Sequence, residues 1–304
     1  MNVDSNNRAP HLTVLSYGIG QDSWTILVKL VKDKEFRQQY APGKLLVIAA
    51  DTGNEHPDTY EHADYTKKFC AQHGVEFVHI TKEMGYHADG WQTLQHYFSK
   101  HNNIASKAYP KTCSDQLKIQ PIYRYLEDYI ESRYGFAAGR KAGLKKFAET
   151  LGKIDVLIGI AKGEEKRVSV GEDPKPWMNQ VLRKRYPLIE IGFGRAECQQ
   201  YLKQAFEPVP PPSNCIMCPF KSKIEVLWTA RNLPQQFNEW VQYEANKIEA
   251  WKDRVSDPSK NLGVNGKKLL PQVLREAEDE YANMSNQDIN EYRMSHGHLC
   301  KNKF

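Results

Sequence analysis

The sequence has no long hydrophobic run. Its longest uninterrupted apolar stretch, LLVIAA, falls far short of the roughly 20 residues that a membrane-spanning helix needs. The polar start, MNVDSNNRAP, contains no apolar segment of the kind found in secretory signals. These absences argue against a membrane-spanning class and predict a cytoplasmic protein.

Cysteine is scarce as well, with six residues in a chain of 304. A disulfide scaffold is not expected in a large cytoplasmic protein, so grouped cysteines indicate metal or redox chemistry instead. Internal repeats and low-complexity segments are lacking too. With 40% hydrophobic and 26% charged residues, the composition is that of an ordinary folded protein.

The surplus of positive charge is small, at a net +5. Basic residues nevertheless gather at 139–146, 162–167 and 183–185. Such clusters are compatible with an anionic partner such as nucleic acid, to which they would bind through the phosphate backbone. Any single cluster also fits a solvated helix face.

Short apolar runs alternate with helical patterns along the first part of the chain. Because each run is short and continuous, we predict buried parallel strands that form a doubly wound α/β sheet. One intervening helix begins at Pro57 and ends at Gly74, the usual placement of these two residues. The strands are expected at residues 12–16, 45–51, 75–81 and 155–161.

A proline-rich break, PVPPPSN, marks the clearest boundary in the chain. We therefore predict an α/β domain over residues 1–210, followed by a Cys-x-x-Cys loop and a helical extension over residues 211–304. Helical spacing runs over residues 222–252, and Pro234 is expected to divide it into two helices. From about residue 253 onward the sequence is polar and weakly patterned.

The first predicted strand leads into SYGIGQDS at residues 16–23 and then into an amphipathic helix. Glycines let backbone N–H groups approach an anion at a helix N-terminus, and Ser16 and Ser23 add hydroxyl donors. A Walker A loop is excluded because it requires a lysine that this loop lacks, and the dinucleotide fingerprint is excluded because Ser23 occupies its third glycine position. The pattern predicts a phosphate-binding loop, although a tight turn alone would also produce it.

The second strand ends in DTGNEHPDTYEH, at the edge of the sheet where ligands usually bind. SYGIGQDS followed by this segment resembles the adenine nucleotide α-hydrolase (PP-loop) group, specifically its phosphoadenosine phosphosulfate (PAPS) reductase-like branch. The chain is also similar to the ATP pyrophosphatases of DNA phosphorothioation systems. Further blocks agree with the branch in order: CSDQLKIQPIYRYL (113–126), LIGIAKGEEKR (157–167), YPLIEIGFGRAECQQYL (186–202) and SNCIMCPFKS (213–222).

The loop departs from the pattern of the group. Its commonest forms are Ser-Gly-Gly-Lys-Asp-Ser and Ser-Phe-Gly-Lys-Asp-Ser, whereas here two residues are inserted and Gln21 replaces the lysine. A phosphate-binding cation is therefore missing from its usual place. The candidates to supply the charge are Lys118, Lys162, Lys166 and Arg167.

The resemblance implies that the chain binds ATP, or a PAPS-like adenine nucleotide, together with Mg²⁺. It implies a catalytic role for Asp22, which would serve Mg²⁺ through water, and for Lys118 and Arg167. Simpler roles stay open, since Asp22 also fits a helix N-cap and Asp51 a turn residue. The implied nucleotide contacts are Ser16, Gly18, Gly20, Asp22, Ser23, Asp51, Thr52, Gly53 and Glu164.

The segment CIMC has a spacing that is frequent in metal sites, but two thiolates do not complete one. Similarity to phosphorothioation enzymes implies a [4Fe–4S] cluster, with zinc as the alternative, and a metal-free pair of buried thiols also stays open. Cys70 and Cys198 lie in helical patterns and are expected to be ordinary buried thiols. The candidate ligands are Cys113, Cys215, Cys218 and Cys300, with His296 or His298 as alternatives to Cys300.

Three functions follow from this pattern. The first is an ATP pyrophosphatase that activates a nucleic acid for sulfur insertion, with a cysteine desulfurase as sulfur donor. The second is a PAPS or adenosine phosphosulfate reductase that uses Cys300, although HGHLCKNKF lacks the usual Glu-Cys-Gly-x-His context. The third is a nucleotide- or nucleic-acid-binding module without turnover, which the Gln21 substitution favours.

Overall fold

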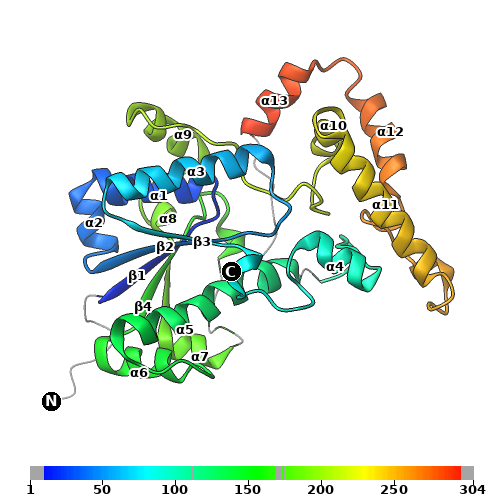
Figure 1. Ribbon diagram of the computed structural model, residues 1–304. Helices are drawn as coiled ribbons and strands as arrows, with labels where there is room; N and C mark the ends of the chain where they lie inside the picture. Colours follow the sequence, from blue (N-terminus) through cyan, green and yellow to red (C-terminus); the bar gives the residue numbers. More distant parts are fainter. Residues whose placement is uncertain (1–9, 111, 169–170, 172, 174, 296–304) are drawn as a thin grey trace.

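The structure is a computed structural model, and it describes residues 10–110, 112–168, 171, 173 and 175–295. Five parallel strands form one sheet in the order β3-β2-β1-β4-β5 (Figure 1). The four strands expected from the sequence are all present, and the doubly wound α/β class is confirmed. The strands are β1 (Leu12–Ser16), β2 (Lys44–Ala50), β3 (Glu76–Ile80), β4 (Ile154–Ile158) and β5 (Leu182–Arg185).

The fifth strand was not expected from the sequence, because LRKR contains a basic cluster and no apolar run. β5 lies at the edge of the sheet and pairs with β4. Across that pair the Arg183 guanidinium binds the buried Asp155 carboxylate, with 2.7 Å between Arg183 Nε and Asp155 Oδ1. An ion pair across neighbouring strands therefore accounts for a strand that lacks an apolar run.

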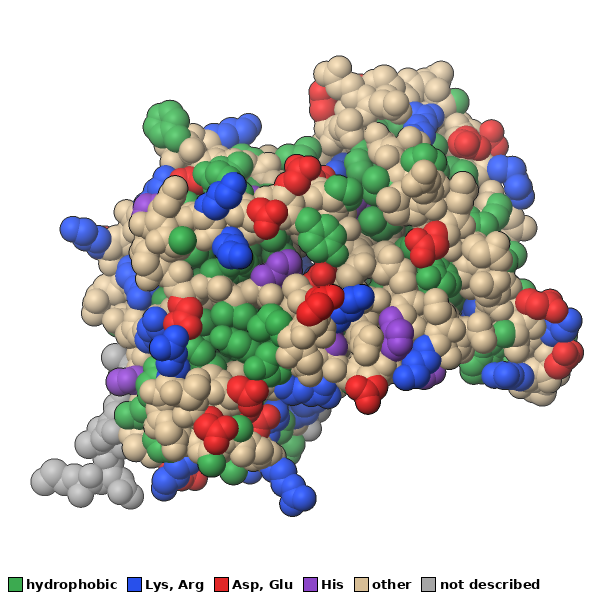
Figure 2. All heavy atoms as spheres, viewed as in Figure 1, with side chains coloured by type: hydrophobic (Ala, Val, Ile, Leu, Met, Phe, Trp, Pro, Cys, Tyr) green, Lys and Arg blue, Asp and Glu red, His purple; other side chains and the backbone are tan. Residues whose placement is uncertain are grey.

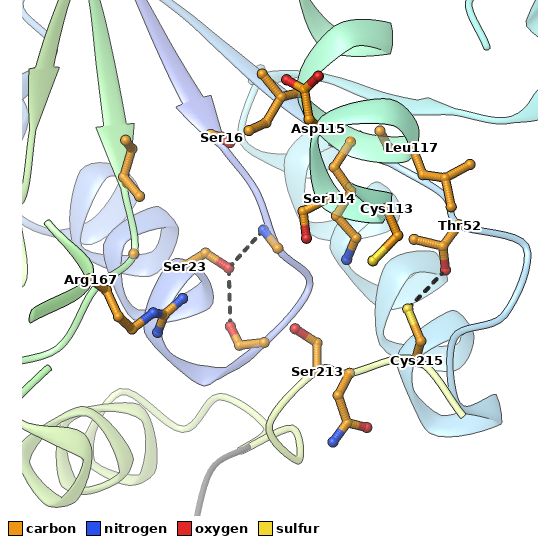
Figure 3. Close-up of a pocket in the computed structure, with 18 of the residues that line it drawn as sticks. Ser16, Ser23, Thr52, Cys113, Ser114, Asp115, Leu117, Arg167, Ser213 and Cys215 are labelled. Atoms are coloured by element: carbon orange, nitrogen blue, oxygen red, sulfur yellow. Dashed lines mark hydrogen bonds between the residues drawn. The ribbon is translucent and has the colours of Figure 1, made fainter. Parts of the chain in front are cut away.

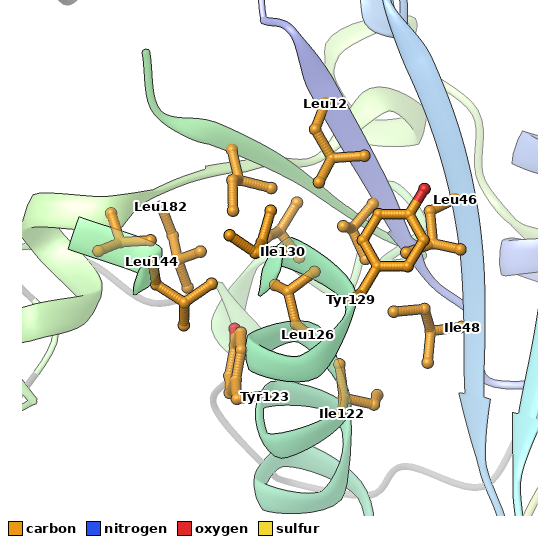
Figure 4. Close-up of a cluster of buried hydrophobic side chains, with 14 of the residues drawn as sticks. Leu12, Leu46, Ile48, Ile122, Tyr123, Leu126, Tyr129, Ile130, Leu144 and Leu182 are labelled. Atoms are coloured by element: carbon orange, nitrogen blue, oxygen red, sulfur yellow. The ribbon is translucent and has the colours of Figure 1, made fainter. Parts of the chain in front are cut away.

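Helices cover both faces of the sheet (Figure 1). One face carries a hydrophobic cluster under five helices, and the other carries the cluster drawn in Figure 4 under three more. The first set is α1 (Gln21–Lys32), α2 (Lys34–Tyr40), α3 (Pro57–Gln72), α8 (Pro187–Glu190) and α9 (Arg195–Gln204). The second set is α5 (Gln120–Tyr134), α6 (Ala142–Leu151) and α7 (Pro176–Val181).

The chain after the proline-rich break is helical, as predicted. Pro234 separates α10 (Lys223–Asn232) from α11 (Pro234–Trp251), which confirms the expected division. These helices share a core with α4 (Leu94–His101), which follows β3. The boundary placed between residues 210 and 211 stays a prediction.

Helices continue beyond residue 253, although the sequence there is polar and weakly patterned. Two further helices follow there, α12 (Leu270–Glu280) and α13 (Asn286–Ser295). Along α12 one narrow face, Leu270, Val273 and Ala277, is buried, and the helix lies against α10. So few apolar positions give little signal in the sequence, and tertiary contacts stabilise the helix. No helix in the described ranges has the length and hydrophobicity required to span a membrane.

Candidate nucleotide-binding site

A cavity of about 840 Å³ opens at the carboxyl ends of β1, β2 and β4. The strand order reverses between β1 and β4, and ligands bind in doubly wound sheets at such a point. Figure 3 shows Arg167 on one side of the 16–23 loop, and Cys113 and Cys215 on the other. The walls of the cavity are formed by the 16–23 loop, the end of β2, and the segments around residues 105–123 and 212–220.

The 16–23 loop is held in a fixed, close-packed conformation. Gly18 N donates to Ser23 Oγ at 3.2 Å, and Ser23 Oγ donates to Gly20 O at 3.2 Å (Figure 3). Ile19 has φ +59°, which is unusual and costly for a branched side chain. Ser16, Gly18, Gly20, Asp22 and Ser23 all line the cavity, as the prediction requires.

Gly20 is required by the segment that crosses the loop. A Cβ atom there would lie 2.8 Å from Ser213 Oγ and 3.1 Å from Ser213 N. We expect Gly20→Ala to lower the free energy of unfolding by about 1–3 kcal/mol through overpacking. Gly18→Ala is the matched control, because a Cβ at Gly18 meets nothing closer than 3.9 Å. Urea unfolding of the two variants tests this, and equal losses would contradict the close contact.

Asp22 lies among charged groups at the N-terminus of α1. Burial raises the pKa of its carboxyl to about 6, Arg195 and Arg167 lower it, and Glu164 raises it. Asp22 Oδ1 is buried and has no hydrogen-bond partner among the residues that the structure describes. An unsatisfied carboxylate oxygen facing a cavity fits the expected water-mediated contact to Mg²⁺.

Sequence reasoning missed Arg195. It is the first residue of α9, and its guanidinium Nη2 lies 2.9 Å from Glu164 Oε1 and 3.9 Å from Asp22 Oδ2. Glu164 also pairs with Arg167, so one carboxylate holds two cations beside the loop. The only available signal was an arginine at a helix start within the YPLIEIGFGRAE block.

The four candidates for the missing loop cation are placed differently. Lys162 and Lys166 are exposed and do not line the cavity. Lys118 lines it and pairs with Glu55, with 2.9 Å between Lys118 Nζ and Glu55 Oε1. Arg167 lines it next to Asp22. Of the four, Lys118 and Arg167 therefore line the cavity, and Arg167 also interacts with Asp22 of the loop.

The carboxylate of Asp51, expected at the nucleotide, belongs to a turn. Asp51 Oδ1 accepts hydrogen bonds from Gly53 N at 2.8 Å and from the Tyr60 hydroxyl at 2.9 Å. Neither Asp51 nor Gly53 lines the cavity, whereas Thr52 does. Gly53 takes φ +68°, so its own contribution is to the turn.

The cavity continues from the loop into an apolar slot. Strand and helix side chains line it between the sheet and the start of α5, where a π-helical turn, η3 (Asp115–Ile119), precedes that helix. π-helical turns are frequent at functional sites. A largely apolar slot beside the 16–23 loop suits an adenine ring. Its apolar lining includes Val14, Ala50, Ile122, Tyr123, Val156 and Met178.

Cys113, Cys215 and Cys218 all line the cavity. Burial, followed by the neighbouring Glu55 carboxylate, raises the pKa of the Cys215 thiol well above its ordinary value. Cys215 Sγ lies 3.3 Å from Thr52 Oγ1 and 3.7 Å from Glu55 Oε1 (Figure 3). A cysteine binds a metal as the thiolate, so Cys215 would release its proton on serving as a ligand.

No group of three His, Cys, Asp or Glu side chains suited to a metal is found in the part of the chain that the structure describes. The expected ligands His296, His298 and Cys300 lie outside the described residues. The ligand set therefore stays a prediction. Cys70 and Cys198 are buried, and burial raises the pKa of each thiol to about 12, as expected for structural cysteines.

Residues 12–143 match the family model of the phosphoadenosine phosphosulfate reductase domain. No curated protein sequence matches the chain. Among solved structures, the U34-tRNA thiolase NcsA from Methanococcus maripaludis, with its [4Fe-4S] cluster, aligns over 91% of this chain and 75% of its own at 13% identity. Its TM-score of 0.38 is too low to bear on fold or function. The matched residues make up less than half of the chain, and over that part the chain is similar to a phosphoadenosine phosphosulfate reductase domain.

Proposed function

We propose that the protein is an ATP pyrophosphatase that activates a nucleic acid for sulfur transfer. The observation that carries the proposal is that a single cavity joins a phosphate-binding loop, an apolar slot and three cysteines. The adenine lies in the slot, and the phosphates lie between the loop and the guanidinium of Arg167. When bound, Mg²⁺ neutralises phosphate charge, and Asp22 holds it through water.

The reaction is a series of displacements. An acceptor oxygen attacks the α-phosphorus of ATP, the bond from that phosphorus to the α,β-bridging oxygen breaks, and pyrophosphate leaves. The terminal sulfur of a cysteine desulfurase persulfide then displaces AMP from the adenylated acceptor. A second thiol attacks the inner sulfur of the resulting S–S bond, which releases the thiolated acceptor and leaves a disulfide between the two thiols. Positioning and electrostatics supply most of the catalysis in phosphoryl chemistry, which suits the fixed loop and its paired cations.

The acceptor end of the cavity lies at the segment 105–109. Lys107 Nζ donates to the Lys221 carbonyl at 3.0 Å, and burial lowers the pKa of the Lys107 amine. Tyr109 is 44% exposed at the cavity wall. An amine for a phosphate and an aromatic ring for a base are the groups that bind single-stranded nucleic acid.

The basic clusters of the sequence support this proposal less than expected. Arg183 pairs with Asp155 and Arg185 with Glu190, so the third cluster is largely neutralised by acidic partners. Figure 2 shows basic and acidic side chains interspersed over the visible face. We therefore propose the cavity as the acceptor site in preference to the cluster at 183–185.

The defining measurement is the product of ATP cleavage. With Mg²⁺ and short single-stranded DNA or RNA, we expect AMP and pyrophosphate, formed faster than without nucleic acid. ADP and inorganic phosphate would contradict α,β-cleavage. Nucleotide binding without any turnover would support the non-catalytic alternative that Gln21 favours.

The family match favours one second candidate, a PAPS reductase, since the matched domain carries that name. Its nucleophile would be Cys300, which lies outside the described residues. Incubation with PAPS and a thiol reductant distinguishes the two candidates. Release of sulfite, lost in Cys300→Ser, would favour the reductase over the pyrophosphatase.

Lys107→Met tests the acceptor end. We expect it to weaken binding of a single-stranded oligonucleotide about tenfold and to reduce the salt dependence by about one phosphate contact, with ATP affinity unchanged. Lys145→Met is the control, because Lys145 is exposed on α6 within a basic cluster. If Lys145→Met gives the larger loss in a titration at several salt concentrations, the clusters bind the nucleic acid and the assignment of Lys107 is wrong.

A further inference from the structure

The residues of the 16–23 loop include no cationic side chain. Gln21, at the start of α1, is only 2% exposed, and its amide bonds to other helices. Its Nε2 donates to Met294 O on α13 at 3.3 Å, and its Oε1 accepts from Gln199 Nε2 on α9 at 3.1 Å. These two bonds hold the Gln21 amide toward α9 and α13, and as a neutral group it brings no positive charge to a phosphate.

The contact between Gln21 and Gln199 brings a different cation to the loop. Arg195 lies four residues before Gln199 on α9, so both side chains project from the same face of that helix. Gln199 meets Gln21, and Arg195 meets the next residue of α1, Asp22. The first turn of α9 thus carries a guanidinium to the place where the loop lacks one.

The guanidinium is only partly satisfied by the protein. Nη2 binds Glu164, whereas Nη1 is buried without a hydrogen-bond partner among the described residues. Arg195 lines the same cavity as the loop. Leaving a charged donor buried and unbonded is costly, which indicates an acceptor that comes with the ligand.

Two carboxylates lie beside the two arginines. Glu164 pairs with both Arg195 and Arg167, and Asp22 Oδ2 lies at 3.9 Å from Arg195 Nη2, beyond hydrogen-bond distance. The two guanidiniums therefore balance the two carboxylates in charge, and Arg195 Nη1 keeps its N–H groups for a phosphate oxygen.

We propose that Arg195 binds the phosphates of the adenine nucleotide and supplies the cation that the 16–23 loop lacks. This inference rests on the proposed function, because it requires that an adenine nucleotide occupies the cavity. It adds a residue outside residues 12–143, the part matched to the family model. Planar, bidentate donation to phosphate oxygens is the property that distinguishes arginine from lysine at such a site.

The test is equilibrium binding of two ligands, α,β-methylene-ATP with Mg²⁺ and adenosine, to the full chain by calorimetry. Arg195→Gln is expected to weaken binding of the ATP analogue at least 30-fold and to leave adenosine binding within twofold. Lys203→Gln, which removes an exposed charge from the last turn of α9, is expected to change neither. Circular dichroism and thermal unfolding confirm that each variant is folded.

A charge-relocation variant makes the test independent of local structural damage. Adding Gln21→Lys to Arg195→Gln is expected to recover at least tenfold of the lost analogue affinity, because it returns a cation to the loop. Unchanged analogue affinity in Arg195→Gln, or an equal loss for adenosine and the analogue, would overturn the role of Arg195 alone. Wild-type protein that binds neither ligand would overturn the proposed function, and the inference with it.

Discussion

Replacing Asp22 with asparagine is expected to make the ligand-free protein more stable while reducing ATP cleavage at least 100-fold. Asparagine has the same shape but no charge to desolvate, and it loses the attraction of Asp22 for Mg²⁺ and the nearby guanidiniums. On the proposed function, Asp22 would therefore be retained for catalysis at the expense of stability.

The size of this stability difference, and its dependence on pH, follow from the carboxyl group of Asp22. Burial raises its pKa from 3.8 to about 6 in the folded protein, so the folded state binds the proton more tightly than the unfolded state. Wild-type stability is then highest below the unfolded pKa and falls as the pH rises toward 6. Above pH 6 the free energy of unfolding of Asp22→Asn should exceed that of wild type by about 3 kcal/mol at most, since one pKa unit corresponds to about 1.4 kcal/mol.

Urea unfolding at a series of pH values, with a chelator present, measures this effect. Asp22→Asn should exceed wild type above pH 6 and equal it near pH 4. Asp64→Asn, an exposed aspartate on α3, is the control and should match wild type throughout. An Asp22→Asn protein that is less stable at pH 7.5 would show that the carboxylate makes favourable contacts in the ligand-free state.

The sequence predicted those elements whose structure depends on residues adjacent in the chain. The strand–loop–helix around Ser16 and Ser23 follows from local patterning, because an apolar run, glycines and helical spacing are contiguous there. The division of the last helices at Pro234 followed from the missing N–H of proline. The loop residues accordingly line the cavity as expected.

The sequence could not show contacts between distant segments. Arg195 and Asp22 meet only because α9 packs against α1, and no local pattern marks an arginine that will face a loop. Asp51 illustrates a second difficulty, since a carboxylate at a strand end suits both a ligand and a turn. Only the position of the Tyr60 hydroxyl shows that the carboxylate of Asp51 stabilises the turn.

The buried ion pair between Glu55 and Lys118 gives the second large effect. Lys118→Met is expected to destabilise the protein by about 3–5 kcal/mol, because it leaves a buried carboxylate without its cation. The Glu55 side chain is 2% exposed, and its Oε2 already lacks a hydrogen-bond partner within the described residues. Burial raises the pKa of Glu55, but Lys118 and the surrounding hydrogen bonds lower it by a larger amount, so the net shift is downward.

Glu55→Gln is expected to cost less, about 1–3 kcal/mol, although it removes the same pair. The Lys118 side chain is 26% exposed, so its ammonium group regains water when the carboxylate is removed. The amide that replaces the carboxylate retains an oxygen for the hydrogen bond from Thr52. The two single variants therefore differ because the desolvation cost falls mainly on the acidic partner.

A double variant that carries both substitutions measures the interaction between Glu55 and Lys118 separately from their other contacts. In Glu55→Gln/Lys118→Met no buried charge is left unpaired, so the double variant should be more stable than Lys118→Met alone by at least 1 kcal/mol. The measurement is a double-mutant cycle, in which the free energies of unfolding of wild type, the two single variants and the double variant are compared at pH 7.5. If the two losses simply add, the pair contributes no coupling. Lys118 would then be held in the cavity for a ligand, and the cavity wall formed by Thr52, Glu55 and Cys215 would not depend on it.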